Sequence, residues 1–325
     1  MDGKVPEKWR LTKIFSNFED GLKPAYNQIY IFLMDAIISY VNGLDPLWLQ
    51  DYQKYCNTPI LAKRFRDWGT LKYLLRGIET HMKFVENVYL LVARDSQVPE
   101  WAGTERLKIV RHEDIMPHDK LPTFNSSMIE MFLHRIPGLD EKYLYFNDDM
   151  FPVSHCEEDD FFPGGKGSIG FVKTYFTGSK YKKLSKDSDH LARRALGIRP
   201  SFVFLRPQHT VSPMLRSACE ELYAKEEQAI LGSCSRIRDD GNFNQYAFLD
   251  YMYYSGRAVS RRTKSRYCSL ASTPLGMILN SIEKPSSKII CINDVKLSDE
   301  RFEKYRKELT DTFERVFPAK SRFEK

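Results

Sequence analysis

Three apolar runs of the chain each end in side chains that carry carboxylate or amide oxygens. These side chains are Asn42 with Asp45, Asn147 with Asp148 and Asp149, and Asn293 with Asp294. Open α/β sheets bind their ligands beyond the carboxyl ends of the strands, so parallel strands would bring these groups together. Their hard oxygen atoms suit Mg²⁺ or Mn²⁺, which bridges the phosphates of a nucleotide. Asn and Asp are also common turn residues, and it is their recurrence at three strand ends that favours a metal and nucleotide site.

Three further side chains suit the transfer of a phosphate group. His209 lies in the stretch 206–210, where a proline restricts the backbone, and an imidazole can accept a proton near neutral pH. Arg236 and Arg238 alternate at the spacing of a strand, which would place both guanidinium groups on one side to hold a phosphate. The alternative interpretations are a structural histidine and two arginines that are merely exposed.

Composition and missing motifs exclude several classes of protein. The chain has 49 Lys and Arg against 43 Asp and Glu, a net charge of +6 that favours anionic ligands without the dense basic stripe of a nucleic-acid binder. Its 6 cysteines have neither the spacing of a zinc site nor the density of a disulfide scaffold, which indicates a reducing cytoplasm. The signature motifs of P-loop kinases, dinucleotide-binding dehydrogenases, zincins and lipases are absent from the sequence.

Hydrophobic periodicity predicts the elements that must position these residues. Strands are expected over 29–41, 88–93, 107–110, 143–146 and 288–292. Helices are expected over 64–82 with Asp67 as N-cap, 127–135 with Ser126 as N-cap, 189–196, 220–230, 243–254 and 299–317. Strands that alternate with helices indicate an α/β fold, with a Rossmann-like, largely parallel sheet flanked by helices and a smaller inserted or helical subdomain.

The sequence divides into five parts. They are a lead-in over 1–28, a first part of the catalytic core over 29–151, an insertion or flap over 152–200, a second part of the core over 201–297, and an amphipathic helix with a basic tail over 298–325. The third part is set apart by its glycines and by a cluster of lysines over 180–186.

Several segments of the chain resemble the conserved blocks of the Stealth family. The first block is 35–48, and the second begins at 64–79 and continues through 121–130, 134–139 and 143–149. The third runs from His209 through 236–238 to 244–245, and the fourth is 291–294. The family includes bacterial capsule sugar-phosphate transferases and the animal N-acetylglucosamine phosphotransferase that tags lysosomal enzymes. Three positions depart from the family pattern, namely Tyr40 in place of Trp, Ser235 in place of His and Asn242 in place of Asp.

The resemblance implies a nucleotide-sugar transferase fold and the transfer of hexose 1-phosphate from a UDP- or CDP-linked donor to a glycan hydroxyl. The product would be a phosphodiester in a capsule or cell-surface polysaccharide, and the leaving group a nucleoside monophosphate. Two alternatives stay open. The first is a metal-dependent glycosyltransferase that releases a nucleoside diphosphate, and the second is an inactive glycan-binding relative.

For a reaction of this kind we expect the following roles for individual residues. Mg²⁺ or Mn²⁺ would bind Asp148 or Asp149 with help from Asn293 and Asp294. Arg236 and Arg238 would stabilise the β-phosphate, and His209 would accept the proton of the acceptor hydroxyl. In an alternative assignment Asp148 is the base and His209 holds a phosphate. The donor would be contacted by Asn42, Asp45, Arg66, Asn147 and Asn244.

The acceptor is expected to be a glycan or a lipid-linked glycan at the inner face of the cell membrane. Residues 1–20 lack the apolar core of a signal peptide, and no run approaches the roughly 20 apolar residues that span a bilayer. A cytoplasmic protein is expected, with a peripheral membrane contact as one interpretation of the amphipathic helix over 299–317. Packing of its apolar side on the catalytic core is the favoured interpretation.

Overall fold

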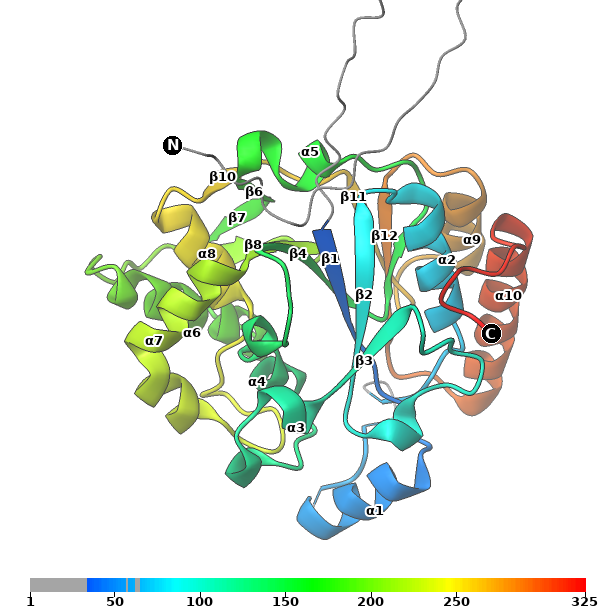
Figure 1. Cartoon of the computed structure of the whole chain (residues 1–325), viewed down its shortest axis with the longest axis horizontal. Coiled ribbons are helices and arrows are strands. Elements are labelled where there is room, and N and C mark those ends of the chain that lie inside the picture. The colour runs from blue at the N-terminus through cyan, green and yellow to red at the C-terminus, as the bar shows by residue number, and fades with distance from the viewer. Residues whose placement is uncertain (1–33, 57, 62–64) are drawn as a thin grey trace, which may run out of the picture.

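The computed structural model describes residues 34–56, 58–61 and 65–325. The expected lead-in over 1–28, and residues 29–33 of the first expected strand, lie outside the described residues. The architecture is the predicted α/β fold, with a largely parallel central sheet between two groups of helices (Figure 1).

The central sheet has the strand order β3-β2-β1-β4-β9. Its parallel strands are β1 (Met34–Ser39), β2 (Val85–Val92), β3 (Leu107–Arg111) and β4 (Lys142–Asn147). Each overlaps a predicted strand. The edge strand β9 (Ser212–Leu215) runs antiparallel to β4 and is not predicted by the sequence, because it is short and contains Pro213, which only an edge strand tolerates.

A second sheet has the order β11-β12-β5. Its strands are β11 (Ser265–Ser269), β12 (Ile289–Asn293) and β5 (Met150–Pro152). β12 is the strand predicted over 288–292, and it pairs parallel to β11 and antiparallel to β5 instead of joining the central sheet. Two small sheets complete the set. They pair β6 (Gly167–Ile169) with β10 (Ala258–Ser260), and β7 (Phe171–Thr174) with β8 (Phe204–Pro207).

Two groups of helices cover the central sheet (Figure 1). One group contains α2 (Leu71–His81), α9 (Leu275–Glu283) and α10 (Asp299–Val316). The other contains α4 (Ser126–Glu130), α6 (Lys180–Ala195), α7 (Arg216–Ser233) and α8 (Tyr246–Tyr254). The remaining helices are α1 (Pro46–Tyr55), α3 (His112–Ile115) and α5 (Glu158–Phe161). Side chains of β1 point alternately to the two sides of the sheet. Ala36 and Ile38 pack in the hydrophobic core that includes residues of α2 and α10, and Ile37 packs in the core that includes residues of α7 and α8.

Several predicted helix boundaries are wrong, and local turns explain them. The helix expected from residue 64 begins at Leu71, because Gly69 has a φ of 69° and the Asp67 side chain accepts from the Gly69 N–H at 2.8 Å instead of capping a helix. The helix expected over 127–135 ends at Glu130 and is followed by a 3₁₀ turn over Leu133–Arg135. The stretch expected over 189–196 is the end of the longer α6, which is capped by Ser179.

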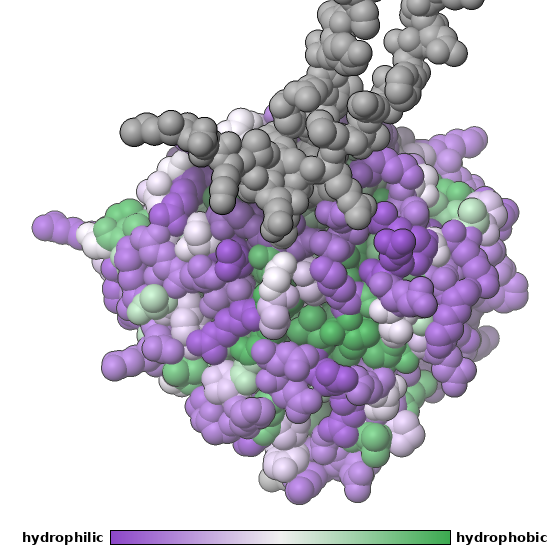
Figure 2. Space-filling view, in the orientation of Figure 1, coloured by the Kyte–Doolittle hydropathy of each residue, from purple (hydrophilic) through white to green (hydrophobic). Residues whose placement is uncertain are grey.

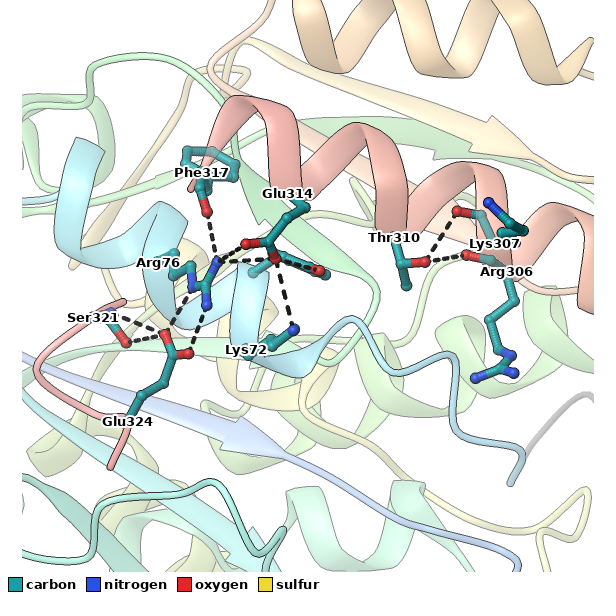
Figure 3. Close-up of polar contacts among 10 residues, drawn as sticks. Lys72, Arg76, Arg306, Lys307, Thr310, Glu314, Phe317, Ser321 and Glu324 are labelled. Carbon is teal, nitrogen blue, oxygen red and sulfur yellow. Dashed lines mark hydrogen bonds and ion pairs between the residues drawn. The ribbon is translucent and has the colours of Figure 1, made fainter. Parts of the chain in front are cut away.

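The C-terminal helix packs on the core, as favoured from the sequence. The ring of Phe313 is 0% exposed and stacks on Tyr73 of α2 with centroids 5.5 Å apart. The buried guanidinium of Arg76 donates to both carboxylate oxygens of Glu324 at 2.8 Å and to Glu314 at 3.2 Å (Figure 3). Figure 2 shows mainly hydrophilic residues over the side where α10 lies, so its apolar side faces inward.

Among the described residues, no helix has the length and apolar character needed to cross a membrane.

Candidate active site

A cavity of about 310 Å³ opens at the carboxyl ends of the parallel strands. Its wall includes Tyr40 after β1, Ala93 after β2 and Asn147 at the end of β4. Asn293 at the end of β12 lines it as well. The position is the one expected for the ligand of an open α/β sheet.

The structure brings about half of the predicted site residues into this cavity. They are Asn147, Asp148, Asp149, His209, Arg238, Asn244 and Asn293. A neighbouring cavity of about 130 Å³ shares Asp148 and Asp149 with the first, and it also has Arg66 and Asp294 in its wall. Asn42, Asp45 and Arg236 line neither of these two cavities.

Asp148 and Asp149, the carboxylate doublet, lie in the turn between β4 and β5. The Asp149 carbonyl accepts a hydrogen bond of 2.9 Å from the Ile292 N–H, which joins the turn to β12. The thiol of Cys291 donates to Asp149 Oδ2 at 3.5 Å. One ligand atom from each of Asp149, His209 and Cys291 lies within 4.8 Å of the others.

The surroundings of the doublet disfavour the ionised form of both carboxyl groups. Burial raises the pKa of Asp148 to about 8, and the nearby carboxylates of Asp149 and Asp67 add to that rise. Burial also raises the pKa of Asp149, against the opposite effect of His209. Asp149 Oδ1 is buried and has no hydrogen-bond partner among the described residues. A divalent cation bound here would give Asp149 Oδ1 a partner. Its positive charge would also favour the ionised form of both carboxyl groups.

Arg66 and Asp294 bind each other. Arg66 donates to the two carboxylate oxygens of Asp294 at 2.7 and 2.5 Å, and Trp68 Nε1 donates to the same carboxylate at 3.0 Å. Both side chains are nearly buried, so the pair ties the loop before α2 to the loop after β12. The paired side chains still line the smaller cavity beside Asp148 and Asp149.

Asn42 and Asp45 act within their own turn. Asn42 Oδ1 accepts from the Leu44 N–H at 2.9 Å, and Asp45 Oδ1 caps α1 by accepting from the Trp48 N–H at 2.7 Å. These are the ordinary turn and cap roles of Asn and Asp.

Arg236 and Arg238, the two arginines of the predicted third block, lie in different surroundings. Residues 234–245 form a loop and not a strand, so the expected placement of both heads on one side is wrong. Arg238 lines the cavity and donates to the Ser126 hydroxyl. Arg236 instead donates to the Leu121 carbonyl at 3.2 Å and lies over the ring of Tyr55.

Ser235 and Asn242, two of the positions expected to depart from the family pattern, stabilise this loop. The Asn242 amide nitrogen donates to the Ser233 carbonyl at 2.6 Å and to Ser235 Oγ at 2.8 Å, and its oxygen accepts from Asn125 at 2.8 Å. Asn242 is 1% exposed. An amide suits this position because it donates and accepts, whereas a carboxylate only accepts. The third departure, Tyr40, lines both cavities beside the doublet.

The residues of the site that are not assigned a role from the sequence include Cys291 and Glu130. Cys291 follows two isoleucines in β12, where the sequence predicts only an apolar core position. Glu130 ends α4, lines the cavity and is 6% exposed, and burial raises its pKa to about 7. The signal for Glu130 is a lone charge inside the apolar stretch 128–133.

Comparison with known proteins gives the relatives of this chain. Models of the Stealth protein conserved region 2 and conserved region 4 match residues 64–169 and 280–325. The capsular polysaccharide phosphotransferase WcwK of Streptococcus pneumoniae is 32% identical over 338 residues, covering 90% of this chain and 99% of that protein. The receptor polysaccharide phosphotransferase WefC of Streptococcus oralis is 30% identical over 337 residues, with the same shares of 90% and 99%.

Among solved structures, the galactosyltransferase LgtC in complex with donor and acceptor sugar analogues has a TM-score of 0.38 and 10% identity, covering 84% of this chain and 95% of that chain. The two conserved-region matches contain the predicted second and fourth blocks, and the two phosphotransferases align along nearly their whole length. The chain therefore belongs to the Stealth family.

Proposed function

We propose that the chain transfers hexose 1-phosphate from a nucleotide sugar to a hydroxyl of a surface polysaccharide. Its relatives are named capsular, exopolysaccharide and receptor polysaccharide phosphotransferases, and the chain is an enzyme of that class. The observation that most supports the proposal is the meeting of Asp148, Asp149, His209 and Arg238 in one cavity at the carboxyl ends of the strands. Carboxylates, an imidazole and a guanidinium together suit phosphoryl transfer.

Asp149 is the main candidate metal ligand, with Asp148 and Asn293 beside it. Bound Mg²⁺ or Mn²⁺ would neutralise the diphosphate of the donor and so favour departure of the nucleotide. Oxygen ligands of this kind suit either Mg²⁺ or Mn²⁺. Asp294 contributes by orienting Arg66 and the loop that carries Asn293.

Different side chains of the cavity have different roles in the transfer. The acceptor hydroxyl attacks the β-phosphorus of the donor, and His209 takes up its proton. A new bond joins the acceptor oxygen to phosphorus, while the bond from phosphorus to the bridging oxygen of the α-phosphate breaks. The nucleoside monophosphate leaves with that oxygen. Arg238 stabilises the charge on the phosphoryl oxygens, and the donor is oriented by Asn147 and Asn244.

The mass of the glycan product tests this proposal. Purified enzyme is incubated with Mg²⁺ or Mn²⁺, a panel of UDP- and CDP-linked sugars, and an acceptor glycan. The proposal expects a product heavier by one hexose and one phosphate. A product heavier by a hexose alone would make the chain an ordinary glycosyltransferase. Absence of turnover with every donor would favour the glycan-binding alternative.

A further inference from the structure

One part of the cavity contains a buried carboxylate that the proposed chemistry does not use. Glu130 lines the cavity at the end of α4 and is 6% exposed. Its Oε2 accepts from the Gln245 N–H at 3.3 Å. Among the described residues no Lys or Arg lies close enough to form an ion pair with it, although the nearby Arg238 guanidinium and a hydrogen bond from the Asn244 side chain oppose the rise in the pKa of Glu130. A buried carboxylate without an ion pair destabilises a fold, which suggests that Glu130 is retained for a ligand.

A second polar group beside Glu130 also lacks a protein partner. Gln245 is 3% exposed and lines the same cavity, and its amide oxygen has no hydrogen-bond partner among the described residues. Asn244 Oδ1, in contrast, already accepts from Ser188 Oγ and the Tyr246 N–H, both at 3.2 Å. The open groups here are therefore acceptors, and they call for a ligand that donates hydrogen bonds.

Aromatic rings complete this part of the cavity. Tyr145, Tyr181 and Tyr246 line it, and the hydroxyls of Tyr181 and Tyr246 lie 2.6 Å apart. A wall that combines tyrosine faces with hydrogen-bond acceptors matches a sugar ring, which has apolar C–H faces and hydroxyl donors at its edge. A phosphate fits poorly, because the carboxylate would repel it.

We propose that Glu130, Gln245 and the three tyrosines form a hexose-binding pocket in which the Glu130 carboxylate accepts hydrogen bonds from ring hydroxyls. The inference rests on the proposed function and names the sugar subsite of the same cavity. Asp149 and His209 then mark the phosphate end, and Glu130 marks the sugar end. The hexose belongs either to the donor or to the acceptor, and kinetics separate the two sources.

The test compares Glu130→Gln and Glu130→Ala with wild type, and Glu227→Gln on the exposed side of α7 is the matched control. KM is measured separately for donor and acceptor, and again with donors that lack one ring hydroxyl. Loss of a hydrogen bond to a charged group should raise KM for the hexose substrate about 10- to 100-fold. Discrimination against the deoxy donor that lacks the contacted hydroxyl should fall by a similar factor.

The outcomes are distinguishable. A rise confined to donor KM, with the loss of discrimination, places the donor hexose in the pocket, and a rise confined to acceptor KM places the acceptor hexose there. Unchanged KM for both substrates in folded Glu130→Gln, or a fall in kcat alone, overturns the inference. If Glu130→Ala does not fold, Glu130→Gln still decides, because it preserves side-chain volume. These KM values can be read whether or not the product contains phosphate, so the proposed function can fail independently.

Discussion

The backbone N–H of Ile292 donates a 2.9 Å hydrogen bond to the carbonyl oxygen of Asp149. This contact fastens β12 to the turn that follows β4, although the two segments lie far apart in the chain. As a result Cys291 and Asn293 meet the carboxylate doublet at one edge of the fold. The proposed metal and phosphate site depends on this junction between the second and fourth conserved blocks.

Removing either charge of the doublet should abolish most of the activity. We expect Asp149→Asn and Asp148→Asn each to lower kcat at least about 100-fold at saturating donor, because a metal ligand contributes several kcal/mol to stabilisation of the transition state. Folding should be retained, since burial opposes ionisation of both carboxyls. Steady-state kinetics and thermal melting check this, with exposed Asp119→Asn as control. Near-normal kcat in both variants would remove the doublet from the site.

His209 should act on the acceptor and leave the donor alone. In His209→Ala we expect kcat to fall about 100-fold or more, while the Kd for the nucleotide sugar changes little. Calorimetric donor titration and single-turnover kinetics measure the two effects. His155→Ala is the control, because the His155 side chain is 68% exposed. A collapse of donor affinity would instead make His209 a phosphate ligand and leave Asp148 as the candidate base.

A buried carboxyl outside the site should make stability depend on pH. Asp250 is 0% exposed, both of its oxygens lack partners among the described residues, and burial raises its pKa well above the usual value. The folded state therefore favours the protonated form, and stability is lost as pH rises above the unfolded-state pKa of about 4. The amide of Asp250→Asn does not titrate. The free energy of unfolding of this variant, relative to that of wild type, should therefore increase as the pH rises.

Urea unfolding at pH 5 and pH 8 measures this effect. Between the two pH values, the difference in unfolding free energy between Asp250→Asn and wild type should shift in favour of the variant by more than about 1.4 kcal/mol, the equivalent of one pKa unit. Asp119→Asn should show no such shift. An equal effect of Asp250→Asn at both pH values would mean that the carboxyl keeps its usual pKa.

The C-terminal helix should behave as part of the core. Phe313→Ala is expected to lower the free energy of unfolding by about 3–5 kcal/mol, because its ring is fully buried between Tyr73 and Phe151. The control Lys304→Ala, whose side chain is 70% exposed, should change it by less than about 0.5 kcal/mol. Denaturant titration compares the two variants.

Deletion of residues 299–325 provides a second test of the same helix. It removes both carboxylate partners of the buried Arg76 guanidinium and should prevent folding. A soluble and active deletion variant that no longer sediments with anionic vesicles would show that the helix is a membrane anchor.

Much of the fold is predictable from the sequence, because the apolar runs of β1, β2 and β4 and the stripe of α10 are long and regular. Strand partners are less predictable. β12 reads as a buried strand, but its pairing with β5 and β11 depends on contacts between distant segments. Local patterns cannot show such contacts.

The candidate site is likewise predictable from the sequence only in part. Strand ends identify Asp148, Asp149 and Asn293, and the lone His209 lies with them in the cavity. The sequence cannot show that Arg66 is bound to Asp294, because that contact spans 228 residues. The loop conformation that turns Arg236 away from the cavity is equally hidden, since alternating residues share a side only in a strand.

The identity of the released nucleotide tests the central claim most directly. The enzyme is incubated with its preferred nucleotide sugar, labelled at the β-phosphorus, together with acceptor and Mn²⁺, and the products are separated by ion-exchange chromatography. We expect release of unlabelled nucleoside monophosphate, with the label in the glycan as a phosphodiester. Release of labelled nucleoside diphosphate, with no label in the glycan, would contradict it.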